Sequence, residues 1–137
     1  MPEKTYMYFR IRGDFKTSEV AEYISLKPWG LKERGERCKE RDLPRSSILN
    51  YGLVEVAIED IPNLFDMSEE LIGVLEPHKS EFLNVIKNFD VITCWTTCLW
   101  MMTDESVSTP SIGFSSRVTK FIGDIGASID VDLYKDQ

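Results

Sequence analysis

Several classes of protein depend on residues or segments that are scarce in this sequence. Histidine occurs once, as His78, and cysteine three times, as Cys38, Cys94 and Cys98. The glycine-flanked serine of hydrolases, the glycine-rich phosphate loop and the HExxH zinc motif are all missing. A run of about 18 apolar residues, which a membrane-spanning helix requires, is missing too. These absences disfavour the corresponding enzyme classes, and we expect no membrane association.

The cysteines form no recognisable framework. An odd count without a secretory signal argues against disulfides. Cys94 and Cys98 would share one face of a strand about 13 Å apart, at roughly 3.3 Å per residue. This separation is too large for one zinc ion or a disulfide without a bend. We interpret them as packing thiols and expect neither a metal nor a cofactor. The charged N-terminus is unlike a signal peptide and predicts a cytoplasmic protein.

Positive charge is in deficit, because 16 Lys and Arg stand against 23 Asp and Glu, a net charge of −7. An acidic surface repels phosphate backbones, so nucleic acid is not an expected partner. Residues 27–45 are the exception, with seven basic against four acidic side chains. This segment either folds back on the acidic remainder, meets an acidic partner, or forms a solvated loop of mixed charge.

The apolar content is sufficient for a hydrophobic core. Hydrophobic residues make up 42% of the 137 positions, which favours a single domain over residues 1–137. Strict alternation places Met7, Phe9 and Ile11 on one side of a first strand. Residues 27–49 are predicted to be a long charged connection, and residues 61–89 an inserted pair of helices or one helix kinked at Pro77. Strands are expected at 5–12, 51–59, 90–102 and 127–134, and further helices at 16–26 and 115–126.

This order of elements predicts an α+β fold. The arrangement is that of a ferredoxin-like split βαβ, an antiparallel sheet with helices on one face and an inserted helical pair. In such a sheet the first and last strands are antiparallel neighbours. Side chains two apart share a face, so Ile129, Val131 and Leu133 are expected to face the helices.

The carboxylates Asp130 and Asp132 would then face water beside Arg10 and Arg12 of the first strand. Opposite charges across a strand pair stabilise by about 0.2–1 kcal/mol each. A metal site would need further converging ligands, and a catalytic pair would need one raised pKa. We therefore interpret the two acids as structural, although the catalytic and metal-binding alternatives stay open.

The uncovered face of the predicted sheet is the candidate binding surface. Tyrosine and arginine are enriched at protein interfaces, although they also occur on ordinary exposed sheets. Trp29, in the basic connection, either fastens that segment to the body or anchors a partner. An RNA-binding sheet is not expected, because the RNP consensus is missing. The candidate residues are Tyr6, Tyr8, Arg10, Arg12, Trp29, Asp130, Asp132 and Tyr134, with Glu55 as a possible neighbour on that face.

Several short stretches together resemble the bacterial domain-of-unknown-function family numbered 4279. The stretches are Gly13-Asp14, Ser18-Glu19-Val20, Leu26-Lys27-Pro28 with Arg34-Gly35-Glu36, and IGASIDVDLY, which contains Asp130, Asp132 and Tyr134. The last is the most specific, and it follows a serine-capped helix. The resemblance implies a single-domain bacterial cytoplasmic protein, and it implies no activity, cofactor or catalytic residues.

Three functional hypotheses follow. The leading one is a non-enzymatic binding protein, in its concrete version an immunity-type protein that neutralises a toxin domain. The second is a small-molecule sensor, which would be favoured by a cavity near Trp95 or Trp100 and by pairing into a homodimer. The third and least favoured is an enzyme, whose only candidates are Cys38, His78, Asp130 and Asp132. Partner, ligand and oligomeric state are not predicted.

Overall fold

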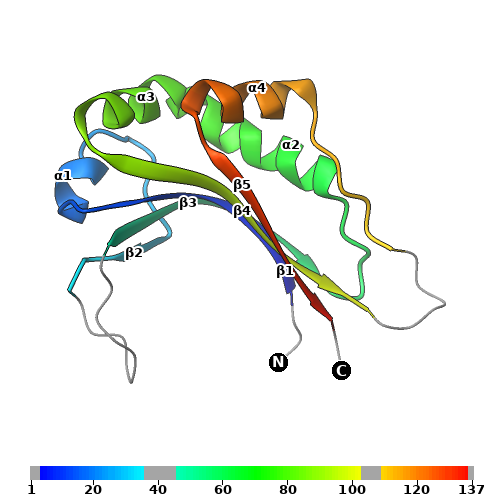
Figure 1. Ribbon diagram of the computed structural model, residues 1–137. Helices are drawn as coiled ribbons and strands as arrows, with labels where there is room; N and C mark the ends of the chain where they lie inside the picture. Colours follow the sequence, from blue (N-terminus) through cyan, green and yellow to red (C-terminus); the bar gives the residue numbers. More distant parts are fainter. Residues whose placement is uncertain (1–3, 36–45, 103–108, 136–137) are drawn as a thin grey trace.

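A mixed α+β architecture is seen in the computed structural model, which describes residues 4–35, 46–102 and 109–135 (Figure 1). All four predicted strands and the predicted helices are present, and the α+β class is confirmed. One strand, β2, was not predicted. The elements are β1 (Lys4–Gly13), α1 (Thr17–Ala21), β2 (Gly30–Lys32), β3 (Ser47–Ala57), α2 (Leu64–Leu75), the 3-10 turn η1 (Glu76–His78), α3 (Lys79–Asn88), β4 (Val91–Met101), α4 (Ser116–Ile125) and β5 (Ser128–Lys135).

The five strands form one sheet in the order β2-β3-β1-β4-β5. The pairs β2–β3, β3–β1 and β1–β4 are antiparallel, whereas β4 and β5 are parallel. The predicted neighbourhood of the first and last strands is therefore wrong, and a ferredoxin-like arrangement is not confirmed. Both edges of β1 are occupied by β3 and β4, and α4 carries the chain back over the sheet so that β5 runs parallel to β4.

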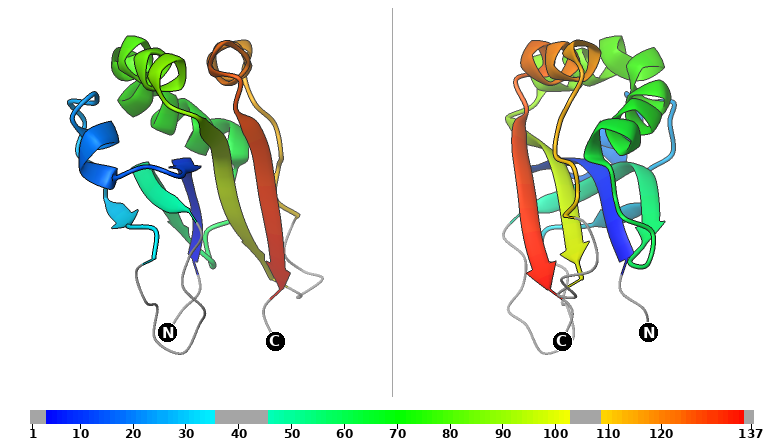
Figure 2. Two further views of the ribbon diagram at one scale, coloured as in Figure 1. Left: turned by 60° about the vertical axis from the view of Figure 1, so that its left-hand side comes forward. Right: turned by 90° about the vertical axis from the view of Figure 1, so that its right-hand side faces the viewer.

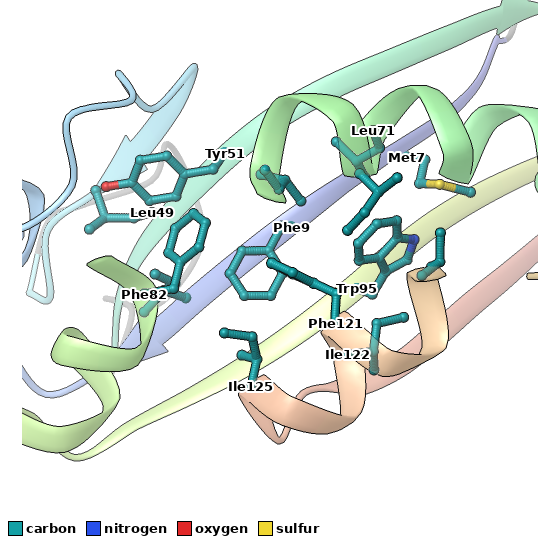
Figure 3. Close-up of a cluster of buried hydrophobic side chains, with 14 of the residues drawn as sticks. Met7, Phe9, Leu49, Tyr51, Leu71, Phe82, Trp95, Phe121, Ile122 and Ile125 are labelled. Atoms are coloured by element: carbon teal, nitrogen blue, oxygen red, sulfur yellow. The ribbon is translucent and has the colours of Figure 1, made fainter. Parts of the chain in front are cut away.

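Helices α2, α3 and α4 lie together over one face of the sheet, and no described helix covers the other face (Figure 1). The core fills the space between the helices and the sheet (Figure 3). Phe9 of β1 contacts Phe82 of α3 at 5.0 Å between ring centroids and Phe121 of α4 at 6.0 Å. The rings meet tilted or edge to face, which is favourable for aromatic quadrupoles. The predicted alternation of β1 is seen, because Phe9 and its neighbours Met7 and Ile11 are fully buried.

Local sequence signals account for the ends of the helices. The Ser115 hydroxyl accepts a hydrogen bond from the Val118 amide, and Gly126 ends α4 in the left-handed conformation, as expected. Asn63 caps α2, and its side chain accepts a hydrogen bond from the Asp66 amide. Pro77 lies in the 3-10 turn that separates α2 from α3, as its missing amide hydrogen requires.

β3 begins four residues earlier than predicted, because a bulge interrupts the alternation from which the strand was predicted. Leu49 and Tyr51 are buried in the core, and so is Val54, so the alternation changes parity between them. Gly52 lies there with φ of +67°, and the pairing with β1 shifts register at this point. The predicted connection at 27–49 thus contains β2 and the first residues of β3, and residues 36–45 lie outside the described part of the chain.

The last strand is less buried than predicted. Val131 packs against the core, but Ile129 and Leu133 on the same side are 46% and 59% exposed. The expectation that all three would be covered by the helices is wrong for two of them. The reason is the position of β5 at the edge of the sheet, beside β4 alone among the described strands (Figure 2).

Candidate functional site

The face of the sheet opposite the helices presents aligned side chains of β1, β4 and β5. Directly paired residues share a face, so the register defines rows that cross the three strands. The rows are Tyr6–Cys98–Asp132, Tyr8–Thr96–Asp130 and Arg10–Cys94–Ser128, with Arg12–Ile92 and Trp100–Tyr134 at either end. The structure therefore brings the predicted residues of β1 and β5 onto one surface, which we call the open face.

A groove of about 510 Å³ runs along the open face. Its floor consists of the small side chains Cys94 and Thr96 of β4, and its walls carry larger ones from the flanking strands. Arg10 and Arg12 lie on the β1 side, and the two acids of β5 lie on the other side. Neighbouring strands are about 4.8 Å apart, so the long side chains of β1 and β5 stand on either side of the short ones of β4. The difference in side-chain length leaves the depression.

The arginines of β1 and the acids of β5 were predicted to be neighbours, but they do not contact each other. Because β4 separates their strands, the backbones of β1 and β5 are about 10 Å apart. Among the described residues, no ion pair joins Arg10 or Arg12 to Asp130 or Asp132. The groove thus has a cationic and an anionic wall that face each other across an uncharged floor.

Arg10 is held in place by two neighbours. Its Nε donates a hydrogen bond of 2.9 Å to Oδ1 of Asn50, and its guanidinium carbon lies 5.3 Å from the centre of the Tyr8 ring. Burial raises the pKa of Tyr8, and the positive charge of Arg10 partly opposes that shift. A guanidinium fixed by one edge and one face loses little freedom when its remaining N–H groups bind a carboxylate.

Trp29 fastens the start of β2 to the open face and stays accessible. Its amide donates to the Asn50 carbonyl at 2.9 Å, and its indole Nε1 donates to the Gly52 carbonyl at 2.8 Å. Its ring meets Tyr8 edge to face at 5.2 Å between centroids. The indole is nevertheless 46% exposed. The two roles considered from the sequence are therefore compatible, since the ring is both anchored and available to a partner.

The remaining aromatic rings of the open face are stacked in pairs. Tyr6 lies parallel to Tyr8 at 6.0 Å, and Trp100 lies parallel to Tyr134 at 4.9 Å between centroids. A hydrogen bond with the Cys98 thiol, helped by burial, raises the pKa of Tyr6 to about 12.

The four residues considered for catalysis are not brought together where they are described. Asp130 and Asp132 lie on the open face, whereas His78 lies in the turn between α2 and α3, in the helix layer (Figure 1). Cys38 lies outside the described residues. Within the described ranges, no group of three or more metal-binding side chains converges. No described helix is both long and apolar enough to cross a membrane.

His78 belongs to a cluster that resembles a catalytic triad in composition only. Ser25 Oγ lies 3.1 Å and Glu81 Oε1 lies 2.6 Å from the same imidazole nitrogen, Nδ1. In a working triad the serine and the acid contact different nitrogens. The Ser25 amide and hydroxyl also donate to Glu81, and the hydrogen bond from His78 is the main cause that lowers the pKa of Glu81. The cluster fastens the segment after α1 to the start of α3.

Some contributors to the open face escaped the sequence analysis. Asn50, which orients Arg10, fell between the predicted connection at 27–49 and the predicted strand at 51–59, and Thr96 was one of several β-forming residues in the predicted strand at 90–102. Neither residue gives a local signal, because only the register of the strands shows that they share a face with Arg10. A cavity near Trp95 or Trp100 would have favoured a sensor, and the hollow beside Trp100 measures about 20 Å³, room for roughly one water molecule.

Comparison with known proteins supports a family and no homologue of known activity. No curated protein and no solved structure is detectably similar to the chain. The family model described as "Domain of unknown function (DUF4279)" matches residues 3–136, which include every element of the sheet and the whole open face. The chain therefore belongs to the DUF4279 family.

Proposed function

We propose that this protein is a non-enzymatic binding protein and that its open face docks a protein partner. The observation that carries the proposal is that the exposed Trp29 and the half-buried Arg10 are both held in place against Tyr8. Trp29 is hydrogen bonded at both its amide and its indole, and Arg10 is held by Asn50 and Tyr8. Tryptophan, tyrosine and arginine dominate the binding energy of interfaces, and side chains that are already ordered lose less entropy on binding.

In its concrete form, the proposal is a bacterial cytoplasmic protein of the immunity type that neutralises a basic toxin domain. The net charge of −7 supports this version, because opposite net charge accelerates association with a basic partner. The mixed charges of the groove support selectivity, because a partner must present an anion to Arg10 and a cation to Asp130.

The test measures how open-face substitutions change affinity for a stoichiometric partner. The partner is purified with the tagged wild-type protein from native lysate, and its dissociation constant is measured by calorimetry. Trp29→Ala is expected to weaken binding at least about tenfold, because truncation of an interfacial tryptophan removes a major contact.

A matched control is available on the helix layer. Phe65 of α2 is 44% exposed, close to the 46% of Trp29, so Phe65→Ala removes a similar exposed ring far from the open face. The control is expected to bind like the wild type. Recovery of no stoichiometric partner, or equal affinity of both variants and the wild type, would contradict the proposed function.

The groove favours one second candidate function, the sensing of a small molecule. A volume of about 510 Å³ is typical of ligand sites, and walls of opposite charge suit a molecule that carries both a carboxylate and an ammonium group. A thermal-shift series with amino acids and short peptides tests it, because a ligand of the folded state raises Tm by mass action. A flat response across the series removes this candidate.

A further inference from the structure

β5 is a long sheet edge whose side chains are open to solvent. It pairs with β4 on one side, and no described strand lies on its other side (Figure 2). Seven of its eight residues are exposed, and the eighth, Val131, is half-buried. The opposite edge of the sheet, β2, spans only three residues. An extended edge presents backbone N–H and C=O groups that can hydrogen bond with a further strand.

The protection of this edge comes from charged side chains, Asp130, Asp132 and Lys135, and not from the backbone of β5. Its sequence SIDVDLYK holds no proline, no glycine and one terminal lysine, and its pairing with β4 runs without a register shift. What it has is a division between two sides. Asp130 and Asp132 project on the open face, and the exposed Ile129 and Leu133 project on the helix side.

The two acids make a second copy of this chain a poor occupant of the edge. Two copies of β5 would pair antiparallel about a twofold axis, and directly opposed residues would share a face. An axis at Val131 places Asp130 opposite Asp132 twice, and an axis at either acid places that acid opposite itself. Like charges in directly opposed positions are destabilising. An axis nearer an end of the strand avoids the conflict but shortens the paired segment.

We propose that β5 accepts an added strand from a protein partner in which basic residues alternate with apolar ones. The basic side chains would lie opposite Asp130 and Asp132, and the apolar ones opposite Ile129, Val131 and Leu133. The net charge of −7 attracts such a segment at long range. This inference rests on the proposed protein-binding function and names the chemistry of the segment that would be bound.

The experiment uses the full chain and a labelled eight-residue peptide in which lysine alternates with valine. Binding is followed by fluorescence anisotropy, and protection of the β5 amides by hydrogen exchange. One control peptide replaces lysine with glutamate, and another keeps lysine but carries N-methyl groups that block strand pairing. The lysine peptide is expected to bind saturably and to slow exchange in β5, whereas neither control peptide is expected to bind.

Two variants test the charge complementarity. The double variant Asp130→Asn with Asp132→Asn is expected to weaken the lysine peptide by about 2- to 30-fold, because two cross-strand charge pairs are lost. The variant Asp130→Lys with Asp132→Lys is expected to bind the glutamate peptide instead. Unchanged exchange of the α2 and α4 amides establishes that each variant is folded.

Equal binding of the N-methylated peptide would overturn strand addition. A wild-type dimer with protected β5 amides would overturn it as well, because a second copy would then occupy the edge. If the partner found through Trp29 bound the Asp130→Lys and Asp132→Lys variant with unchanged affinity, this inference would fail while the protein-binding function stood.

Discussion

The two faces of the sheet share the same strands but bury their side chains by different means. On the helix side, Phe9 and Trp95 are fully buried beneath α3 and α4. On the open face, Tyr8 and Thr96 are only 5% and 6% exposed although no described helix covers them. Neighbouring side chains, such as the ring of Trp29 over Tyr8, provide that cover. The helix side therefore stabilises the fold, while the side chains of the open face are ordered by one another and leave Trp29 exposed.

The largest expected difference between the two faces of β1 is the loss of stability when an aromatic ring is removed. Phe9→Ala is expected to lower the free energy of unfolding by about 3–5 kcal/mol, because it leaves a cavity among Phe82 and Phe121. Tyr6→Ala on the same strand is expected to cost less, because its neighbourhood can relax into water. Denaturant unfolding of both variants measures the difference. Equal losses would show that the open face is as tightly packed as the core.

The bulge at Gly52 keeps both halves of β3 correctly oriented towards the core. Gly52→Ala is expected to destabilise the protein by about 1–2 kcal/mol, because φ there is +67° and a side chain in that conformation is strained. The added Cβ would also come within 2.6 Å of Leu71 Cδ1. Gly73→Ala is the control, since its Cβ meets nothing within 4 Å and lies in a helix. A stable Gly52→Ala protein would mean that the register change does not need a glycine.

Two adjacent threonines of β4 allow the two faces to be compared by removing one hydroxyl from each. Thr97 is fully buried on the helix side, and its hydroxyl has no hydrogen-bond partner among the described residues, whereas Thr96 forms part of the groove floor. Thr97→Val is expected to raise the free energy of unfolding by about 1 kcal/mol, because it removes an unpaired buried polar group. Thr96→Val should change stability less. Destabilisation by Thr97→Val, in the same denaturant assay, would reveal a partner for that hydroxyl.

The stability of the protein at low pH should depend on an ion pair between helices α3 and α4. Asp124 of α4 receives hydrogen bonds from Lys120 and from Lys79 of α3, and these lower the pKa of Asp124 to about 2. Its contribution to stability is therefore complete above its ordinary pKa of 3.8 and is lost as the pH falls towards 2. Asp124→Asn should lower stability at pH 7 slightly and flatten the dependence on pH below 4. An identical acid profile for the variant, measured by thermal unfolding, would contradict this assignment.

Local patterns were sufficient for most elements. The alternation around Phe9, the Ser115 cap and the Gly126 stop each depend on neighbours within a few residues, and all three were predictable. The place of β5 was not, because the choice between pairing with β1 and pairing with β4 depends on contacts between distant segments. The parity change at Gly52 hid the start of β3 for a related reason, since a bulge interrupts the alternation used to detect a strand.

The residues of the candidate site could be predicted from the sequence, but their arrangement in space could not. Side chains of β1 and β5 were assigned to the open face from alternation alone, and the structure places them there. The groove was not predictable, since it depends on β4 entering between the arginines and the acids. The contacts of Trp29 depend on the bulge carbonyl of Gly52, which no local pattern indicates.

The central position of β1 has a consequence for how the chain folds. The N-terminal strand pairs with β3 and β4, so Phe9 meets Trp95 only after most of the polypeptide is available. Contacts between segments so far apart in sequence carry a large loop-closure entropy and slow the search for the native state. During synthesis β1 can pair with β3 first, but its other edge stays open until β4 has emerged, and until then its apolar side is vulnerable to aggregation.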